Sequence, residues 1–161
     1  MDTPGQPPLA MSDAAAAILL VDDGRYLLQL RDQFPHIWYP GHWGLFGGGV
    51  ETGEDEVEAL GRELREEIGF EFDIERAQLF TRFHFDLRPV GLRCYFRSYY
   101  EVPIRAAALP HLKLNEGAGM RAFTGEEALA LHLSPYDGFA IFMHFCRKRL
   151  IEPPSSPLPP H

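Results

Sequence analysis

The chain has 161 residues, enough for one domain with a sizeable hydrophobic core and too few for a second. Hydrophobic residues make up 45% and aromatic residues 12%, as in ordinary globular domains. The formal net charge of −8 argues against a nucleic-acid duplex as partner, because duplexes favour basic surfaces. Nucleotides remain open as ligands, since bound metal ions can neutralise their phosphates.

Both ends of the chain are rich in proline. Five of the ten residues 152–161 are prolines, and residues 1–13 contain three more. Such segments have little apolar surface to bury. The sequence therefore predicts a disordered tail over residues 1–13, one domain over residues 14–150 and a proline-rich tail over residues 151–161. The alternative is a tail that docks on a partner.

The first half of the domain reads as strands joined by turns. Ala14–Val21 is a buried strand, and residues 22–24 form a tight turn into Arg25–Arg31, where apolar and polar residues alternate. A loop over residues 32–42 follows, and then a short strand over Trp43–Phe46. The aromatic residues of this loop either pack locally or border a ligand; they are Phe34, Trp38 and Tyr39.

A glycine-rich turn, residues 47–49, runs directly into an acidic helix. Thr52, Glu54 and Asp55 suit a helix start, which places the first turn near Glu54, and Gly69 ends the helix. Its core-facing residues recur at helical spacing; they are Val57, Leu60, Leu64 and Ile68.

Three carboxylates fall together on the flank of this helix: Glu63, Glu66 and Glu67. Like charges at these spacings cost roughly 0.2–0.5 kcal/mol per pair, and Arg62 and Arg65 relieve only part of the repulsion. A hard cation such as Mg²⁺ or Mn²⁺ would relieve it better, and substrate phosphates usually complete the shell of a bound Mg²⁺. This pattern points towards phosphate chemistry, but composition alone favours the alternative, an exposed acidic helix whose charges are merely solvated.

The second half mixes strands and helices. Together with the first half it predicts a central mixed sheet with helices on two sides. The expected strands are Phe70–Ile74, Thr81–Leu87, Leu92–Val102 and Met120–Phe123, and the expected helices are Glu126–His132 and Tyr136–Leu150. We expect the apolar stripe of the last helix to face the core; its members are Phe139, Phe142, Met143 and Cys146.

The two cysteines, Cys94 and Cys146, are too few for a disulfide framework or a thiolate zinc site. We expect reduced core residues and therefore a cytoplasmic protein. The longest apolar run, Ala14–Val21, is too short to span a bilayer and lacks a preceding basic segment, so we expect neither a membrane partner nor a targeting signal. The oligomeric state is left open, a homodimer included.

The glycine turn and acidic helix resemble the box of the Nudix hydrolase family, which reads Gly, five residues, Glu, seven residues, Arg-Glu-apolar-any-Glu-Glu-any-Gly-apolar. Every fixed position is filled, by Gly48, Glu54, Arg62, Glu63, Leu64, Glu66, Glu67, Gly69 and Phe70. In the family a tryptophan, an apolar residue, a proline and two glycines commonly lead into the box. The chain matches this approach except that Phe46 stands where proline is usual.

The resemblance implies an α/β fold, an α/β/α sandwich with a central mixed sheet over about residues 14–150. It also implies hydrolysis of a pyrophosphate bond in a nucleoside diphosphate linked to another moiety, with Mg²⁺ or Mn²⁺. The substrate is then a small molecule such as a nucleoside triphosphate, a modified nucleotide or a nucleotide sugar. The alternative is a binding or sensing module that keeps the fold without catalysis.

Site residues follow from the same resemblance. Glu63, Glu66 and Glu67 are the expected metal ligands, with the Gly47 carbonyl as an extra one. Glu54 and Arg62 are expected to support this cluster, Arg62 as a pairing partner of the carboxylates.

Glu116, in a late loop whose glycines suggest mobility, is expected to reach the metal ion or its water. The alternative is an exposed loop residue, and the general base is either Glu116 or Glu63. We expect Gly48, Trp43 and Phe46 to border the substrate.

Overall fold

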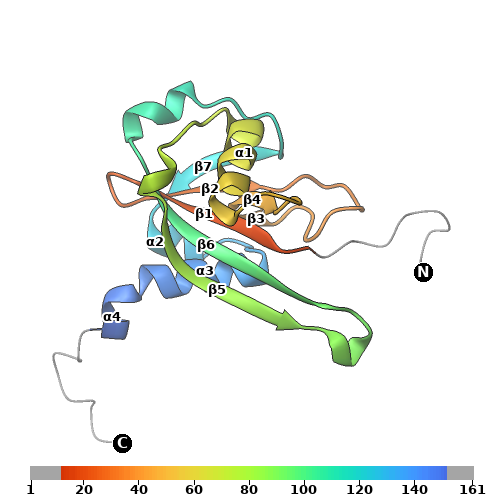
Figure 1. Cartoon of the computed structure of the whole chain (residues 1–161). Helices are drawn as coiled ribbons and strands as arrows, with labels where there is room; N and C mark the ends of the chain where they lie inside the picture. The colour runs from red at the N-terminus through yellow and green to blue at the C-terminus, as the bar shows by residue number, and fades with distance from the viewer. Residues whose placement is uncertain (1–11, 152–161) are drawn as a thin grey trace, which may run out of the picture.

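The computed structural model describes residues 12–151, so most of the two predicted tails lies outside the described residues. Its centre is a mixed sheet of seven strands (Figure 1). The strands are β1 (Ala14–Val21), β2 (Tyr26–Leu30), β3 (Trp43–Gly44), β4 (Phe46–Gly49), β5 (Gln78–Asp86), β6 (Cys94–Ile104) and β7 (Gly119–Phe123). Strand β1 runs parallel to β6 and antiparallel to β2 and β4. The predicted mixed sheet is therefore confirmed.

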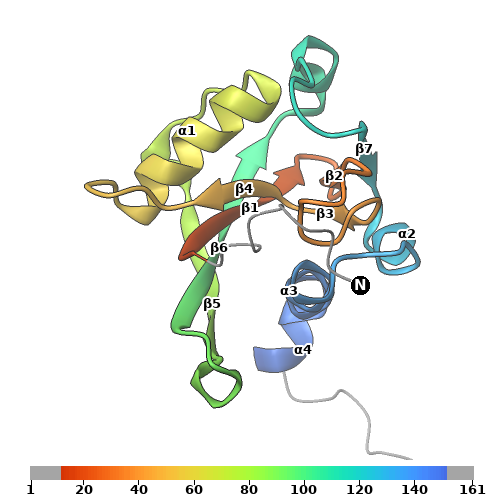
Figure 2. The same ribbon diagram turned by 90° about the vertical axis from the view of Figure 1, so that its right-hand side faces the viewer.

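Helices cover both faces of this sheet. They are α1 (Glu56–Ile68), α2 (Gly125–Leu129), α3 (Pro135–Phe145) and α4 (Arg147–Ile151). Helix α1 lies on one face, whereas α2 and α3 lie on the other (Figure 2). This arrangement is the α/β/α sandwich expected from the sequence.

Strand β1 is apolar throughout because both of its faces are covered. Ala15, Ala17 and Leu19 pack with the α1 side of the core. Ala16 and Ile18 pack with the core on the α3 side. The continuous apolar run in the sequence therefore reflects burial on two sides.

Helix α1 begins and ends close to where the sequence places it. Asp55 is its N-cap, and its side chain accepts hydrogen bonds from the N–H groups of Val57 and Glu58. The Glu58 side chain bonds back to the Asp55 N–H, which completes a capping box. Gly69 closes the helix in the left-handed conformation, with φ of 64°.

Two predicted elements are wrong. Residues 70–73 form no strand; the Asp73 side chain instead caps a short 3-10 helix at Ile74–Arg76. The last helix is interrupted at Cys146, so α3 and α4 are separate. Arg147 Nη1 donates to the His144 carbonyl oxygen at 2.8 Å and takes an acceptor that a continuous helix would use.

The predicted core stripe of the last helix is also wrong. The buried residues of α3 are Asp137, Ala140, Ile141 and His144, whereas Phe139 is 54% and Phe142 47% exposed. Asp137 and His144 take core positions because each finds polar partners inside the protein.

His144 joins α3 to the sheet. The Tyr26 hydroxyl lies 2.8 Å from its Nδ1, Glu101 Oε2 lies 2.7 Å from its Nε2, and Arg147 Nη1 lies 3.3 Å from Nδ1. Burial lowers the pKa of His144, and the Glu101 carboxylate opposes this shift only in part.

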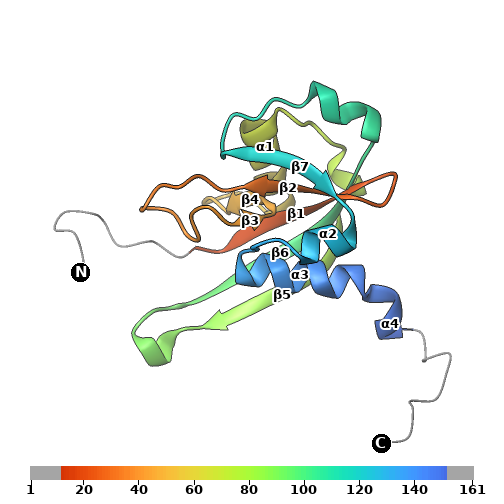
Figure 3. The same cartoon turned by 180° about the vertical axis from the view of Figure 1, so that it is seen from behind.

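The β5–β6 hairpin extends beyond the helices and leaves its tip unsupported (Figure 3). Cys94, at the start of β6, is exposed there, which corrects the prediction of a core residue; both Cys94 and Cys146 are free thiols. Within residues 12–151 no helix is long and apolar enough to cross a membrane.

Two residues next to the predicted domain ends, Asp13 and Ile151, are part of the described structure. Asp13, assigned to the tail by the sequence, accepts hydrogen bonds from Val50 N–H through its carbonyl and from Phe96 N–H through Oδ1. At the other end, α4 continues to Ile151. The hydrogen bonds that hold the start of β1 in the sheet therefore include Asp13, the residue before the apolar run.

Candidate active site

The glycine turn packs directly against β1. Gly47 has φ of 133°, and a Cβ there would lie 2.2 Å from the Ala15 carbonyl oxygen. Its N–H donates to Glu67 Oε2 at 2.9 Å. Glycine is therefore required at this position both for the backbone conformation and for the close approach to β1.

Arg62 ties the first half of α1 to the turn. Its Nε lies 2.7 Å from Glu54 Oε1 and its Nη1 lies 2.8 Å from Glu63 Oε1. Its Nη2 donates to the Gly49 carbonyl at 3.0 Å. The guanidinium lowers the pKa of Glu54. These contacts have the geometry of a pairing partner for carboxylates.

The three box glutamates occupy different environments. Glu67 is 5% exposed, and its burial raises the pKa to about 8, with the Gly47 N–H opposing the shift and the nearby carboxylates of Glu63 and Glu116 adding to it. Burial also raises the pKa of Glu63, although Arg62 opposes it. The side chain of Glu66 is 61% exposed.

A short segment after β6 brings Glu116 to this helix. The Asn115 N–H donates to the Glu67 carbonyl at 2.8 Å, and Asn115 Nδ2 donates to the Glu66 carbonyl at 3.0 Å. The Glu116 carboxylate lies near enough to raise the pKa of Glu63 and of Glu67. We call Glu63, Glu66, Glu67 and Glu116 the acidic cluster.

The carboxylates of the acidic cluster influence one another, and two of them also have hydrogen-bond partners of their own. Among residues 12–151 no group of three or more His, Cys, Asp or Glu side chains is arranged to hold a metal ion. Glu63 is turned towards Arg62, and Glu67 towards the Gly47 N–H. Each of these two carboxylates therefore already accepts a hydrogen bond from within the protein.

The donor set nevertheless suits a hard divalent cation. All four side chains offer carboxylate oxygens, which Mg²⁺ and Mn²⁺ prefer. A Cβ at Gly48 would lie 2.6 Å from Glu63 Oε1, so glycine leaves room for this carboxylate beside the turn. The residues present therefore fit the metal ion that the sequence implies.

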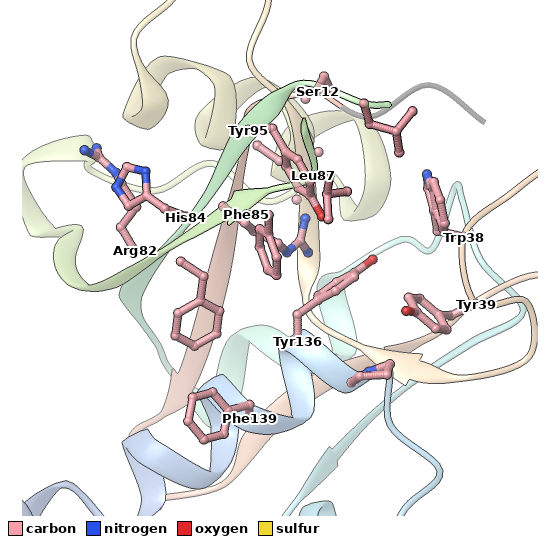
Figure 4. A pocket seen from close by; sticks show the side chains of 18 of the residues that line it. Ser12, Trp38, Tyr39, Arg82, His84, Phe85, Leu87, Tyr95, Tyr136 and Phe139 are labelled. Atoms are coloured by element: carbon pink, nitrogen blue, oxygen red, sulfur yellow. The ribbon is translucent and has the colours of Figure 1, made fainter. Parts of the chain in front are cut away.

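A cavity of about 930 Å³ opens beside residues 47–49. Aromatic side chains enter it from three elements: Trp38 and Tyr39 from the loop of residues 32–42, Phe85 and Tyr95 from the hairpin, and Tyr136 from α3 (Figure 4). Arg82 and His84 are also among the lining residues, although their side chains lie on the other side of β5 from Phe85. We call this cavity the aromatic pocket.

Three arginines line the aromatic pocket, Arg31, Arg82 and Arg97, and Arg31 also acts on the acidic cluster. Arg31 donates from Nε to the Trp38 carbonyl at 2.7 Å. Its charge lowers the pKa of Glu67 and opposes the burial that raises the pKa of Tyr136. Arg31 therefore lies between the acidic cluster and the pocket.

Arg97 forms a buried ion pair at the pocket wall. Its side chain is 12% exposed, and its Nη2 lies 3.1 Å from Oδ1 of Asp137, which is 1% exposed. Asp137 Oδ1 also accepts from the Tyr99 hydroxyl at 3.1 Å, and Oδ2 accepts from the Leu45 N–H at 3.0 Å. Burial alone would lower the pKa of Arg97, but Asp137 and the neighbouring tyrosines raise it.

Residues 11–135 match the family model of the NUDIX domain. The chain therefore belongs to the NUDIX family. A nucleoside triphosphatase, NudI of Escherichia coli O139:H28, is 51% identical over 51 residues, which are 32% of this chain and 36% of NudI. The chain thus matches about a third of the length of that relative.

Solved structures show the same fold. The MutT protein of Methanosarcina mazei Go1 has a TM-score of 0.67 at 21% identity, over 86% of this chain and 94% of that one. A MutT NUDIX hydrolase of Burkholderia pseudomallei has a TM-score of 0.63 at 25% identity, over 81% of this chain and 95% of that one.

Of the three residues of this NUDIX domain that were predicted to border the substrate, two lie outside the lining of the aromatic pocket. Gly48 lines the pocket, but Trp43 packs edge-on against Phe123 with ring centroids 4.9 Å apart. Phe46 is fully buried with the α1 side of the core. The side chain of Phe46 therefore lies on the face of the sheet that α1 covers.

Sequence reasoning missed the polar residues of the pocket wall in this NUDIX domain. Arg97 lies in β6, which also carries Ser98 and Glu101, and Asp137 is the one acidic residue of the largely apolar α3. A lone carboxylate in an apolar helix was the signal for a buried polar partner elsewhere in the chain. The pairing of Arg97 with Asp137 across 40 positions became visible only in the structure.

Proposed function

We propose that this chain hydrolyses a pyrophosphate bond in a nucleoside diphosphate linked to another moiety, using Mg²⁺ or Mn²⁺. Nucleoside triphosphates are the favoured class, and modified nucleotides and nucleotide sugars are the others. The observation that carries the proposal is the adjacency of the acidic cluster and the aromatic pocket at Gly47–Gly48, with Arg31 between them. The local match to a nucleoside triphosphatase supports it.

The acidic cluster would hold the metal ion through the carboxylates of Glu63, Glu66, Glu67 and Glu116, with the Gly47 carbonyl as a further ligand. A bound divalent ion polarises phosphate oxygens and lowers the pKa of bound water. Arg62 and Glu54 support the cluster, because Arg62 contacts both Glu54 and Glu63.

The aromatic pocket would bind the nucleoside. Stacking of a base on an aromatic side chain is worth about 1–3 kcal/mol, and Tyr95 and Phe85 already stack with centroids 4.7 Å apart. Arg97 offers a guanidinium held in place by Asp137, which suits a carbonyl or ring nitrogen of a base. Arg31 suits the phosphates that connect the pocket with the acidic cluster.

The bond changes are simple. The oxygen of a water molecule attacks one phosphorus, the bond from that phosphorus to the bridging oxygen breaks, and the leaving phosphate keeps the bridging oxygen. The attacking water loses one proton to a carboxylate of the acidic cluster, and Glu63 and Glu116 are the two candidates. No covalent intermediate on the chain is required.

The test is a panel of nucleoside triphosphates, oxidised nucleotides, nucleotide sugars, ADP-ribose and dinucleoside polyphosphates, assayed with Mg²⁺. We expect turnover of at least one nucleotide and its loss in Glu63→Gln. Glu126→Gln, on the exposed surface of α2, is the matched control and should keep parental turnover. Nucleotide binding without any turnover would favour the binding module instead.

The free thiols of Cys94 and Cys146 support a cytoplasmic location, because that compartment keeps cysteines reduced. Cell fractionation tests this part of the proposal. The acidic net charge supports a partner list limited to small nucleotides, without a nucleic-acid duplex or a membrane. A homodimer remains compatible with the chain, and sedimentation measures the oligomeric state.

A further inference from the structure

The segment that carries Glu116 is attached to the protein from two directions. On one side the Asn115 N–H donates to the Glu67 carbonyl of α1 at 2.8 Å. On the other side the buried Gln29 of β2 donates from Nε2 to the Glu116 carbonyl at 3.1 Å. Gly117 has φ of 96°, and a Cβ there would lie 2.8 Å from Gln29 Nε2. This glycine therefore serves close packing, whereas the sequence suggested mobility.

Asp32 provides a third attachment. The Gly117 N–H donates to Asp32 Oδ2 at 3.1 Å. Asp32 is the first residue of the loop over residues 32–42, and its carbonyl accepts from the Gly41 N–H at 3.0 Å, which closes the base of that loop. Arg31 fastens the same loop through its bond to the Trp38 carbonyl. Asp32 thus closes the loop through its backbone carbonyl and bonds the segment that carries Glu116 through its side chain.

The far end of this loop forms a wall of the aromatic pocket. Trp38 and Tyr39 both line the pocket. Tyr39 has φ of 49°, an unusual conformation for a residue with a side chain, and its ring meets that of Tyr136 with centroids 5.5 Å apart. A ligand in the pocket would therefore contact a loop whose base is bonded to Gly117.

We propose that Asp32 is a positioning residue that couples the loop over the aromatic pocket to the segment carrying Glu116. The inference rests on the proposed function and adds that a filled pocket sets the position of the Glu116 carboxylate. Recognition of the nucleoside in the pocket then raises kcat, and does not only strengthen binding. A nucleotide that fills the pocket reacts faster than a bare polyphosphate because its base holds the loop in place.

The kinetic test uses Asp32→Ala and Asp32→Asn. Both variants keep the groups that bond within the base of the loop, because these bonds come from the backbone of Asp32 and from Arg31, and only the bond that ties the loop to Gly117 is changed. Asp32→Ala should lower kcat about tenfold and leave KM within about twofold, as expected for one lost hydrogen bond to a charged group. Asp32→Asn retains an acceptor oxygen and should restore most of the loss. A raised KM at unchanged kcat would overturn the proposal.

A double-mutant cycle shows whether the effect passes through Glu116. In the Glu116→Gln background, Asp32→Ala should change kcat by less than about twofold, because the group that it positions is already absent. If the double variant instead lowers kcat by the product of the two single-variant factors, the coupling is overturned. Asp23→Ala is the matched control: this exposed aspartate of the β1–β2 turn pairs with Arg25, and its removal should leave kcat unchanged.

Hydrogen–deuterium exchange tests the mechanical link without ligand or turnover. Asp32→Ala should speed exchange in residues 115–118 and also in residues 33–41 on the other side of the link. Unchanged exchange in residues 33–41 would overturn the coupling even in an active enzyme. If exchange responds as expected but the parent hydrolyses no nucleotide, the proposed function fails and the claim that the coupling serves turnover fails with it.

Discussion

Removal of Asp137 should destabilise the domain strongly. The change Asp137→Ala deletes the partner of the buried Arg97 guanidinium and leaves an uncompensated charge, which costs about 3–5 kcal/mol. It also takes the acceptor from the buried Leu45 N–H, which costs roughly 1–3 kcal/mol. Even the lower limits add to about 4 kcal/mol, a large part of the 5–15 kcal/mol typical of a domain.

Urea unfolding monitored by tryptophan fluorescence measures this loss. With a slope of about 2 kcal/mol per molar urea, the midpoint should fall by about 2 M. The variant Arg97→Met combined with Asp137→Leu removes both charges and should recover most of the stability, because apolar replacements of a buried pair are often neutral. A loss below about 1 kcal/mol in Asp137→Ala, or a double variant as unstable as the summed single variants, would refute the reasoning.

Three further predictions concern the metal ion, the ends and pH. EDTA should abolish activity and Mg²⁺ restore it, and Glu67→Gln should lower turnover by on the order of 10²-fold with the fold intact by circular dichroism. Deletion of residues 1–11 and 152–161 should shift the melting temperature by less than about 2 °C, as scanning calorimetry can check. The contribution of His144 to the free energy of unfolding should fall from about pH 7.5 to about pH 5.5, because the folded state binds a proton at His144 less readily than the unfolded state. Buried Glu67, whose pKa is raised to about 8, acts in the opposite direction over the same range, so the contribution of His144 is read as the difference between the parent and His144→Gln in parallel urea titrations. This difference should be smaller at about pH 5.5 than at about pH 7.5.

The family and the layers of the fold were readable from the sequence because they depend on local patterns. The spacing of Arg62, Glu63, Glu66 and Glu67 needs one helix, and a helix start and stop at Asp55 and Gly69 can be read from neighbouring residues. The apolar run of β1 likewise reports burial without knowledge of its partners.

The pocket wall was not readable because it depends on contacts between distant segments. Phe139 and Asp137 lie on the same helix, yet the sequence pattern favoured Phe139 for the core and gave no reason to bury Asp137. Only the approach of β6, which brings Arg97 to α3, makes the polar residue the buried one. Trp43 and Phe46 lie outside the pocket lining for the same reason, since the strand pairings decide which way each side chain points.

The two adjacent glycines of the turn offer the sharpest test of the site. In Gly47→Ala, the new Cβ would meet the backbone of β1, with the Ala15 carbonyl oxygen at 2.2 Å, in a conformation with positive φ. Backbone cannot move aside as a side chain can, so we expect a loss of more than about 2 kcal/mol in urea unfolding. In Gly48→Ala, the nearest atoms instead belong to the Glu63 carboxylate at 2.6–2.8 Å, the far end of a flexible side chain.

Gly48→Ala should therefore separate stability from activity. Glu63 can rotate away, so the free energy of unfolding should change by less than about 1 kcal/mol, but the carboxylate then leaves its place beside the turn and turnover with Mg²⁺ should fall at least about tenfold. Gly61→Ala, on the helix α1 that carries Glu63, is the matched control, because its Cβ would meet only Ile74 Cγ2 at an ordinary 3.9 Å. It should keep parental turnover and gain up to about 1 kcal/mol from helix propensity. Parental turnover in Gly48→Ala would mean that the position of the Glu63 carboxylate beside the turn is irrelevant to hydrolysis, and the acidic cluster would then have to work without it.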